Sequence, residues 1–251
     1  MKATVFTRLA SGEDDTLDPF MLEFGSTLER SRQPLESEGF FHSASDLKPQ
    51  EVRRNEGLRS VFKEILHADL MRHDKQDFLE YDGGRRVKLA QASSGQQEAL
   101  PLLFLLARFL SLGHVRGRAV YIEEPEAHLF PSTQKQIVEF MARVFRARKG
   151  EMRLVFTTHS PYILTATNNL PQAGMFYEQA NPEKAKRLSQ VLPKSISFNT
   201  GDVGVYALEN GAAKNIMDKE TGLIDASPID RVSNDIAIQF EKLLEEGNEQ
   251  S

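Results

Sequence analysis

The chain has 251 residues, with 31 basic and 36 acidic side chains and a formal net charge of −5. It contains no cysteine, which excludes a disulfide scaffold, a thiolate metal site and a cysteine nucleophile. The modest negative charge provides no strong overall field to attract nucleic acid or an anionic membrane. The longest apolar run, residues 100–112, contains Arg108 and is too short to span a bilayer, so we expect a cytoplasmic protein that does not enter the membrane.

Residues 1–85 are predicted to form an N-terminal region that includes a helical lobe. Gly and Pro residues interrupt the first 50 positions, where the pattern predicts only a short strand over residues 3–9. Apolar residues then recur at helical spacing, which predicts an amphipathic helix from Gly57 to about Met71. The apolar stripe of this helix consists of Leu58, Val61, Phe62, Ile65, Leu66 and Leu70. A turn is predicted at residues 82–84.

Residues 86–180 alternate between helical and strand-like patterns. Short apolar runs at residues 119–122 and 154–158 predict two buried strands. Between them, Ser132 or Thr133 is predicted to cap a helix with one apolar face. A strand, helix and strand of this length predict a right-handed crossover and a parallel sheet, and therefore an α/β fold.

The segment before the first of these strands begins a further helix. The pairs Ser93/Gln96 and Ser94/Gln97 both fit the spacing of a capping box, so the helix is expected to start there. The residues that follow, up to Gly113, are apolar nearly all round. A helix of this kind has to be buried on several sides.

Residues 181–251 are predicted to form a small C-terminal α+β extension. Strand-like stretches occur at residues 203–208 and, shortly before the extension, at residues 175–177. The Asn210-Gly211 pair predicts a hairpin turn. A final helix is indicated by the apolar residues Ile236, Phe240, Leu243 and Leu244.

Three short segments carry groups suited to chemistry. Adjacent carboxylates, Glu123 and Glu124, follow a predicted strand at the edge where open α/β sheets bind ligands. Glu123 is suited to orienting Mg²⁺ and Glu124 to polarising water, although an acidic turn after a strand is also common. His159 follows the next strand, where it can meet a phosphate or serve a structural role. The third segment, Ser93 to Gln96, opens a helix, where backbone N–H groups favour an anion, although it is also an ordinary N-cap.

The order and spacing of these segments resemble the distal half of an ABC-type AAA ATPase head. Residues 92–96 are similar to the signature motif, residues 119–124 to Walker B, residues 124–129 to the D-loop, and His159 to the switch histidine. The strings SSGQQE, IEEPEAHLFP and TTHSPYIL are especially similar to the AAA-type branch. That branch includes the OLD-like (overcoming lysogenization defect) nucleases and ATPases of bacterial defence systems.

The resemblance implies a role for each matching residue. Ser93 and Gly95 would contact the γ-phosphate of ATP held by an opposing subunit, Gln96 would support the loop, and Ser94 would belong to the same nucleotide-binding segment. The metal ligand would be Glu123, where ABC transporters usually have Asp. The resemblance assigns the catalytic roles of general base to Glu124 and of γ-phosphate sensor to His159. It therefore implies an α/β, partial ABC-ATPase-like head with Mg²⁺ and ATP as cofactors.

The phosphate-binding loop of that family is missing from this sequence. It contains no Gly-x-x-x-x-Gly-Lys-Ser/Thr motif, so no backbone nest and no lysine are expected to hold the β-phosphate. ATP and Mg²⁺ binding should therefore be weak or absent unless a P-loop comes from another segment or chain. We expect the chain to be a C-terminal fragment or one part of a split ATPase, in preference to a degenerate paralogue, and we expect self-association or a P-loop-bearing partner. Whether it acts as an enzyme depends on that P-loop.

Three other functions compete with the composite ATPase. The first is a non-catalytic interaction or regulatory module that retains the ATPase fold. The second is a nuclease, which is disfavoured because the acidic residues Asp14, Asp15 and Asp225 do not form the pattern that a Toprim domain needs. The third is nucleic-acid binding, through the complex, by a basic face that is more often only solvated. That face comprises Arg143, Arg146, Arg148, Lys149 and Arg153.

Overall fold

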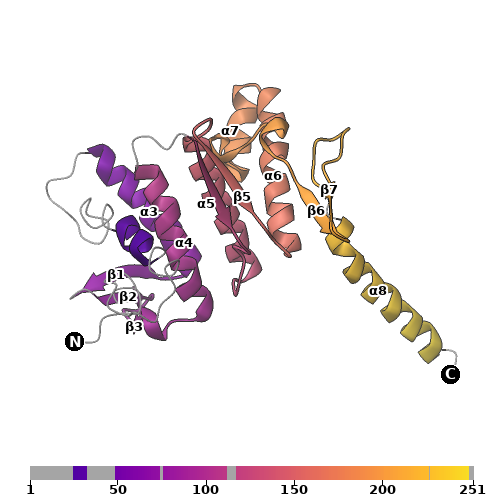
Figure 1. The fold of residues 1–251 in the computed structure, drawn as a ribbon, viewed down its shortest axis with the longest axis horizontal. Helices are drawn as coiled ribbons and strands as arrows, with labels where there is room; N and C mark the ends of the chain where they lie inside the picture. Colours follow the sequence, from indigo (N-terminus) through magenta and orange to yellow (C-terminus); the bar gives the residue numbers. More distant parts are fainter. Residues whose placement is uncertain (1–24, 33–48, 74–75, 112–116, 226, 249–251) are drawn as a thin grey trace. The chain divides into compact units, whose positions relative to one another are not determined.

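The computed structural model describes residues 25–32, 49–73, 76–111, 117–225 and 227–248. The chain divides into two compact units, Met1–Phe156 and Thr157–Ser251 (Figure 1). The strand predicted at residues 3–9 lies outside the described residues. The domain boundaries predicted after residues 85 and 180 stay predictions. None of the described helices is both long enough and apolar enough to cross a membrane.

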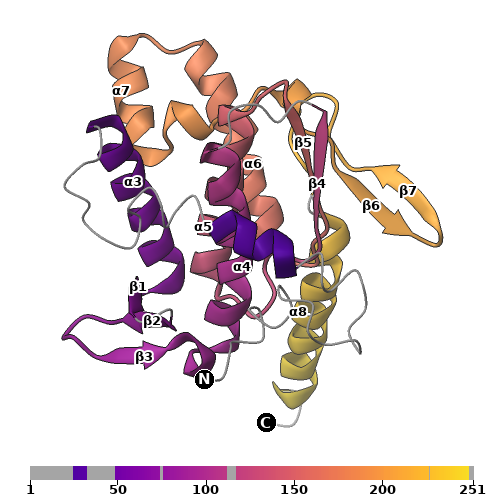
Figure 2. The same ribbon diagram turned by 60° about the vertical axis from the view of Figure 1, so that its left-hand side comes forward.

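Three helices pack against one another in the first unit (Figure 2). They are α3 (Pro49–Leu66), α4 (Ser94–Ser111) and α5 (Pro131–Ala147). Phe62 of α3 is 1% exposed, and its ring centroid lies 5.8 Å from that of Phe104 in α4 and 6.4 Å from that of Phe140 in α5. The rings are tilted or edge-on, the arrangement that aromatic quadrupoles favour. The predicted helical lobe therefore does pack beside the helix that follows Ser93.

The helix predicted from Gly57 to about Met71 begins earlier than predicted, at Pro49, and also ends earlier. α3 stops at Leu66 because His67 adopts a left-handed backbone conformation, with φ of 52°. Leu70, assigned from sequence to the helical stripe, instead pairs across strands with Leu79, and both side chains are buried. The antiparallel sheet contains β1 (Asp69–His73), β2 (Gln76–Glu80) and β3 (Arg86–Lys88). The turn predicted at residues 82–84 is confirmed, and it joins β2 to β3.

Gly57, in the interior of α3, provides a test of helix stability. A Cβ atom added there would meet nothing within 4 Å. Because glycine loses more backbone entropy in a helix than alanine does, Gly57→Ala should raise the free energy of unfolding by about 0.5–1 kcal/mol. Urea denaturation followed by circular dichroism measures the change. In the control, Gly84→Ala, φ of 80° should make the same substitution destabilising.

The predicted parallel pairing is confirmed in the first unit, but the prediction that both strands are buried is wrong, and the second strand ends at Phe156 rather than at residue 158. β4 (Arg118–Ile122) pairs with β5 (Met152–Phe156). Ile122 lies opposite Phe156, so both strands end at the same edge of the sheet. Val120 and Met152 are buried, whereas Tyr121 is 76% exposed and Val155 is 45% exposed. One face of this strand pair is therefore covered, and the other presents apolar side chains to solvent.

The start of α5 differs from the prediction. Its N-cap is Phe130, with Pro131 in the first turn and no side-chain capping bond, so neither Ser132 nor Thr133 caps the helix. The Thr133 hydroxyl instead lies 3.1 Å from Nε2 of His67. Thr133 thus fastens the N-terminal end of α5 to the segment that follows α3.

The second unit consists mainly of helices and one hairpin. Its elements are α6 (Pro161–Glu178), α7 (Pro182–Val191), β6 (Tyr206–Glu209), β7 (Ala212–Asn215) and α8 (Ser227–Asn248). Asn210 and Gly211 have φ of 50° and 77°, as a type I′ turn requires, which confirms the predicted hairpin. The final helix is also confirmed, and the four apolar residues that indicated it, Ile236, Phe240, Leu243 and Leu244, are exposed. The strand predicted at residues 175–177 is wrong, because these residues continue α6.

The predicted fold class holds for the described residues. A parallel strand pair, a helical lobe before α4 and a small C-terminal unit with a hairpin and helices together make an α/β protein. The antiparallel sheet β1–β3 was not anticipated. It lies between α3 and α4 along the chain.

Candidate functional site

The segment that resembles a signature motif forms the N-terminal end of α4. Ser93 makes the predicted capping box with Gln96. Its backbone N–H donates to Oε1 of Gln96 at 3.2 Å, and its hydroxyl accepts from the Gln96 N–H at 3.4 Å. The alternative box between Ser94 and Gln97 does not form, because the Gln97 N–H donates to the Ser93 carbonyl at 3.0 Å and its Nε2 to the carbonyl of Ala92 at 2.8 Å. Ser93 and Ser94 are both exposed.

Gln96 connects this segment to two other elements. Its Nε2 donates to the carbonyl of Leu66, at the C-terminal end of α3, at 2.6 Å. Its Oε1 accepts from the Tyr81 hydroxyl, directly after β2, at 3.1 Å. Gln96 therefore links the C-terminal end of α3 and the residue after β2 to the start of α4. Its role at a nucleotide stays a prediction. Sequence reasoning missed Tyr81, since no spacing signal relates it to the residues around Ser93.

The carboxylate pair follows β4 directly. Glu123 and Glu124 are both exposed, and Pro125 behind them is buried. Glu124 has φ of 42°, a left-handed conformation that costs free energy in a residue other than glycine. Two overlapping turns then shape residues 124–129, with Ala127 N–H donating to the Glu124 carbonyl at 2.9 Å. Pro125 and these turns fix the direction in which the chain leaves the sheet edge.

The signature-like and D-loop-like segments contact each other within the first unit. A Cβ added to Gly95 would lie 2.4 Å from the carbonyl oxygen of His128, closer than real Cβ atoms approach. Glycine at position 95 therefore allows the backbone of α4 to approach the loop. Nε2 of His128 also lies 3.5 Å from Oε1 of Glu98, an exposed contact that adds little stability by itself. Sequence reasoning did not select His128, and the sequence gives no signal for this contact.

His159 lies in the second unit, three residues after β5, and is exposed. Its neighbours stabilise the start of α6. The Ser160 hydroxyl accepts from the N–H groups of Tyr162 at 3.1 Å and Ile163 at 3.4 Å, and Ser160 N–H donates to the Thr158 hydroxyl at 3.0 Å. Thr158 and Ser160 thus explain why this sequence forms a helix start. The role of His159 at a site shared with Glu124 stays a prediction.

The described residues contain no group of three or more His, Cys, Asp or Glu side chains that could hold a metal ion. Mg²⁺ commonly takes one or two protein carboxylates and completes its coordination with water and phosphate oxygens. The exposed carboxylates after β4 fit that need. Glu123 is the residue expected to hold Mg²⁺, and the remaining ligands would come from the nucleotide and water.

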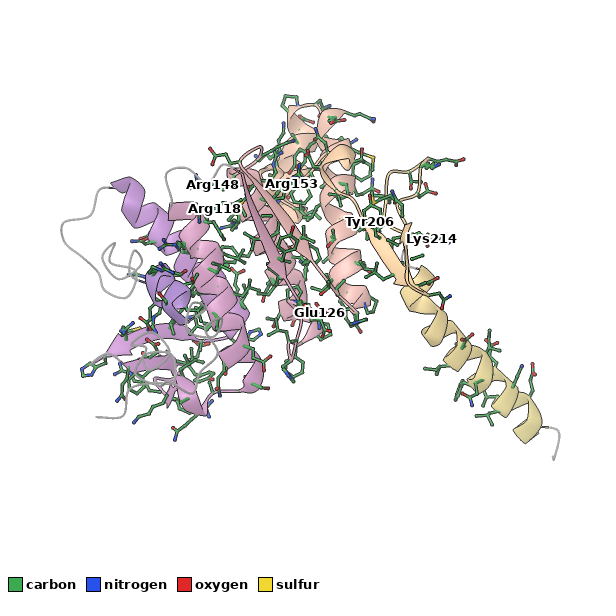
Figure 3. The ribbon with its side chains drawn as sticks, viewed as in Figure 1. Arg118, Glu126, Arg148, Arg153, Tyr206 and Lys214 are labelled. Atoms are coloured by element: carbon green, nitrogen blue, oxygen red, sulfur yellow. The ribbon has the colours of Figure 1, made fainter. Side chains whose placement is uncertain are left out.

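Basic side chains gather at the opposite end of the parallel strands. Figure 3 shows Arg118, Arg148 and Arg153 at that end and Glu126 at the other. The prediction that Arg148 belongs to a solvated basic face is wrong. Its Nε donates to the carbonyl of Phe109 at 2.7 Å and its Nη2 to that of Leu110 at 3.1 Å, so the guanidinium satisfies the end of α4.

A protein-family model described as "AAA domain, putative AbiEii toxin, Type IV TA system" matches residues 2–165. The chain belongs to this AAA-domain family. The matched span includes α4, the carboxylates after β4 and His159, so the AAA domain carries the segments described above. Its fold is therefore that of an AAA-type ATPase domain. None of the curated proteins matches this chain.

Two solved structures of SMC proteins are similar to this chain. One is described as "Structural biochemistry of ATP-driven dimerization and DNA stimulated activation of SMC ATPases". It is 10% identical, with a TM-score of 0.41, and the match covers 84% of this chain and 97% of that one. The other is an Smc head domain with an extended coiled coil, bound to the C-terminal domain of ScpA, from Pyrococcus furiosus. It is 13% identical, with a TM-score of 0.34, and the match covers 65% of this chain and 43% of that one. The family match and the elements described above, rather than these scores, establish the fold.

Proposed function

We propose that this AAA domain supplies a signature motif, Walker B carboxylates and a switch histidine to a composite site that hydrolyses Mg-ATP. The observation that carries the proposal is the pair Glu123 and Glu124, directly after β4 in a chain whose residues 2–165 match an AAA-domain family. Ligands of open α/β sheets bind outside the carboxyl ends of the strands. The pair stands at that edge.

The two carboxylates would have different tasks. Mg²⁺, when bound, would supply charge neutralisation for the phosphate oxygens, and Glu123 would hold it with the help of water. Glu124 would accept the proton of the attacking water, as a general base. Its strained backbone supports this assignment, since such strain is common at functional sites. His159 would sense the γ-phosphate.

The rest of the site would come from elsewhere. Ser93, Ser94 and Gly95 stand at the N-terminal end of α4, where the N–H groups of the first turn and the helix dipole favour an anion such as a γ-phosphate. The P-loop would belong to another segment or chain, because the sequence contains no such motif. The exposed Tyr121 and Val155 support association, since burying apolar side chains drives it. The partner would be a second copy or a P-loop-bearing protein.

Glu124→Gln should abolish most ATP hydrolysis without preventing assembly. The amide keeps the size of the side chain but cannot accept the proton, and loss of a general base typically costs about 10²–10⁴-fold in rate. The measurement is phosphate release by the assembly purified under native conditions through a tag on this chain. Calorimetry with Mg-ATP on the chain alone complements it, and weak or absent binding is expected there.

The matched control is Glu209→Gln, which changes an exposed glutamate on the β6–β7 hairpin. An assembly that carries this variant should hydrolyse ATP at the wild-type rate. Equal rates for the Glu124 and Glu209 variants would refute the role of Glu124. Tight Mg-ATP binding by the isolated chain would instead show that a phosphate loop exists within it, and the composite site would be wrong.

A non-catalytic interaction module is the second candidate. The exposed apolar residues of α8, among them Phe240 and Leu243, favour it, because such a stripe is suited to docking another protein. The two candidates predict different results for partner binding. A module would bind its partner equally well with and without Mg-ATP, and the Glu124→Gln variant would bind as the wild type does.

A further inference from the structure

The carbonyl oxygen of the Gln96 side chain has more donors than it can fully accept. The Tyr81 hydroxyl lies 3.1 Å away, the Ser93 hydroxyl 3.1 Å and the Ser93 N–H 3.2 Å. An amide oxygen has two lone pairs, so three donors compete for two acceptor positions. One of the donors can leave without exposing an unsatisfied acceptor.

The orientation of the Gln96 amide is fixed by its other end. Its Nε2 donates to the carbonyl of Leu66 at 2.6 Å, and that carbonyl can only accept. The Oε1 atom must therefore face Tyr81 and Ser93. Leu66 is fully buried and ends α3, so its carbonyl needs this donor.

The hairpin between β2 and β3 holds Tyr81 in place. Its N–H donates to the carbonyl of Arg85 at 2.9 Å, and the Arg85 guanidinium lies over its ring, 4.6 Å from the centroid. The backbone and the ring of Tyr81 therefore both contact Arg85, on the other side of the turn. The Tyr81 hydroxyl reaches Gln96 from this hairpin, whereas Ser93 lies at the start of α4.

We propose that Tyr81 is a positioning residue that frees the Ser93 hydroxyl for a phosphate oxygen. While Ser93 donates to Gln96, its O–H proton is not available to a nucleotide. When that hydroxyl turns outward, Tyr81 and the Ser93 N–H fill both lone pairs of the Gln96 oxygen, so the N-terminal end of α4 keeps its shape. The inference rests on the proposed function of Ser93 at a γ-phosphate.

The first test is a double-mutant cycle on the chain alone, read by NMR from the side-chain amide of Gln96 and the backbone N–H of residue 93. Tyr81→Phe leaves two donors and should keep the backbone N–H of residue 93 protected within about twofold. Ser93→Ala also leaves two donors but removes the acceptor of the Gln96 N–H, so the cycle compares what Tyr81→Phe adds in each background. The double variant leaves one donor, and protection of that N–H should fall about tenfold. Additive effects of the two changes would overturn the proposal.

The second test measures hydrolysis by the assembly. Tyr81→Phe should lower kcat by about tenfold with KM for ATP unchanged, because nucleotide affinity belongs to the P-loop. In the Ser93→Ala background the same change should have no further effect on kcat. Tyr206→Phe, which alters an exposed tyrosine on β6, is the matched control and should behave as wild type.

The outcomes separate this inference from the proposed function. If Ser93→Ala lowers kcat and Tyr81→Phe does not, the role of Tyr81 is wrong and the composite site stands. If Ser93→Ala hydrolyses ATP at the wild-type rate, the signature role itself is wrong, and the inference fails with it.

Discussion

Gly174→Ala is expected to lower the free energy of unfolding of the second unit by about 3 kcal/mol. A Cβ at this position of α6 would lie 1.7 Å from the carbonyl oxygen of Phe198, whereas real Cβ atoms essentially never approach closer than 3.0 Å. Alanine improves helix propensity by about 1 kcal/mol, but the clash is with backbone, which cannot rotate away. The chain must separate there, and this strains the bond from Phe198 N–H to the Leu170 carbonyl, at 3.1 Å.

Urea denaturation and hydrogen exchange at the Phe198 amide measure this effect. The control is Gly201→Ala in the same unit, where a Cβ would meet nothing within 4 Å, and its stability should stay within about 0.5 kcal/mol of wild type. Equal stability of the Gly174 and Gly201 variants would show that α6 and the Phe198 segment do not approach each other as described.

Gly95→Ala should impair both stability and hydrolysis. The new Cβ would lie 2.4 Å from the His128 carbonyl oxygen and 3.3 Å from Cδ2 of Leu129, so the loop that begins at Glu124 has to move. Overpacking of this kind costs about 1–3 kcal/mol. A displacement of a catalytic group by about 1 Å can cost about 10²-fold in rate, so kcat should fall by about that factor.

Phosphate release and urea denaturation of the same preparation separate the two effects. Gly57→Ala is the matched control, because it makes the same chemical change in α3 with an opposite expected effect on stability. A Gly95→Ala protein with wild-type kcat would mean that the position of the loop after β4 does not govern hydrolysis, and Glu124 would lose its proposed role.

The predictable parts of the fold were those specified by residues close together in the sequence. The capping box of Ser93 and Gln96 lies within one helical turn, and the Asn210-Gly211 turn is specified by two residues that tolerate positive φ. The parallel strands followed from their apolar runs and the helix between them. The two carboxylates after β4 were recognised for the same reason, because they adjoin a strand end.

The unpredicted parts depend on contacts between distant residues. Helical periodicity continued past Leu66, but the left-handed conformation of His67 and the pairing of Leu70 with Leu79 ended the helix. Apolar residues 175–177 suggested a strand, whereas their helix is set by the Ser160 cap far upstream. Tyr81 reaches Gln96 only because the chain after β2 lies beside the start of α4.

The long connection between β4 and β5 has a consequence for the order of folding. Arg118 pairs with Met152 only after the intervening chain, including all of α5, has closed into a loop. Loop closure costs entropy, and parallel pairing is therefore slow compared with helix formation. We expect α5 to form early and the strand pair late. Glu124 would reach its position near the end of folding, so a chain paused before that stage would already have helical signal and no competent carboxylate pair.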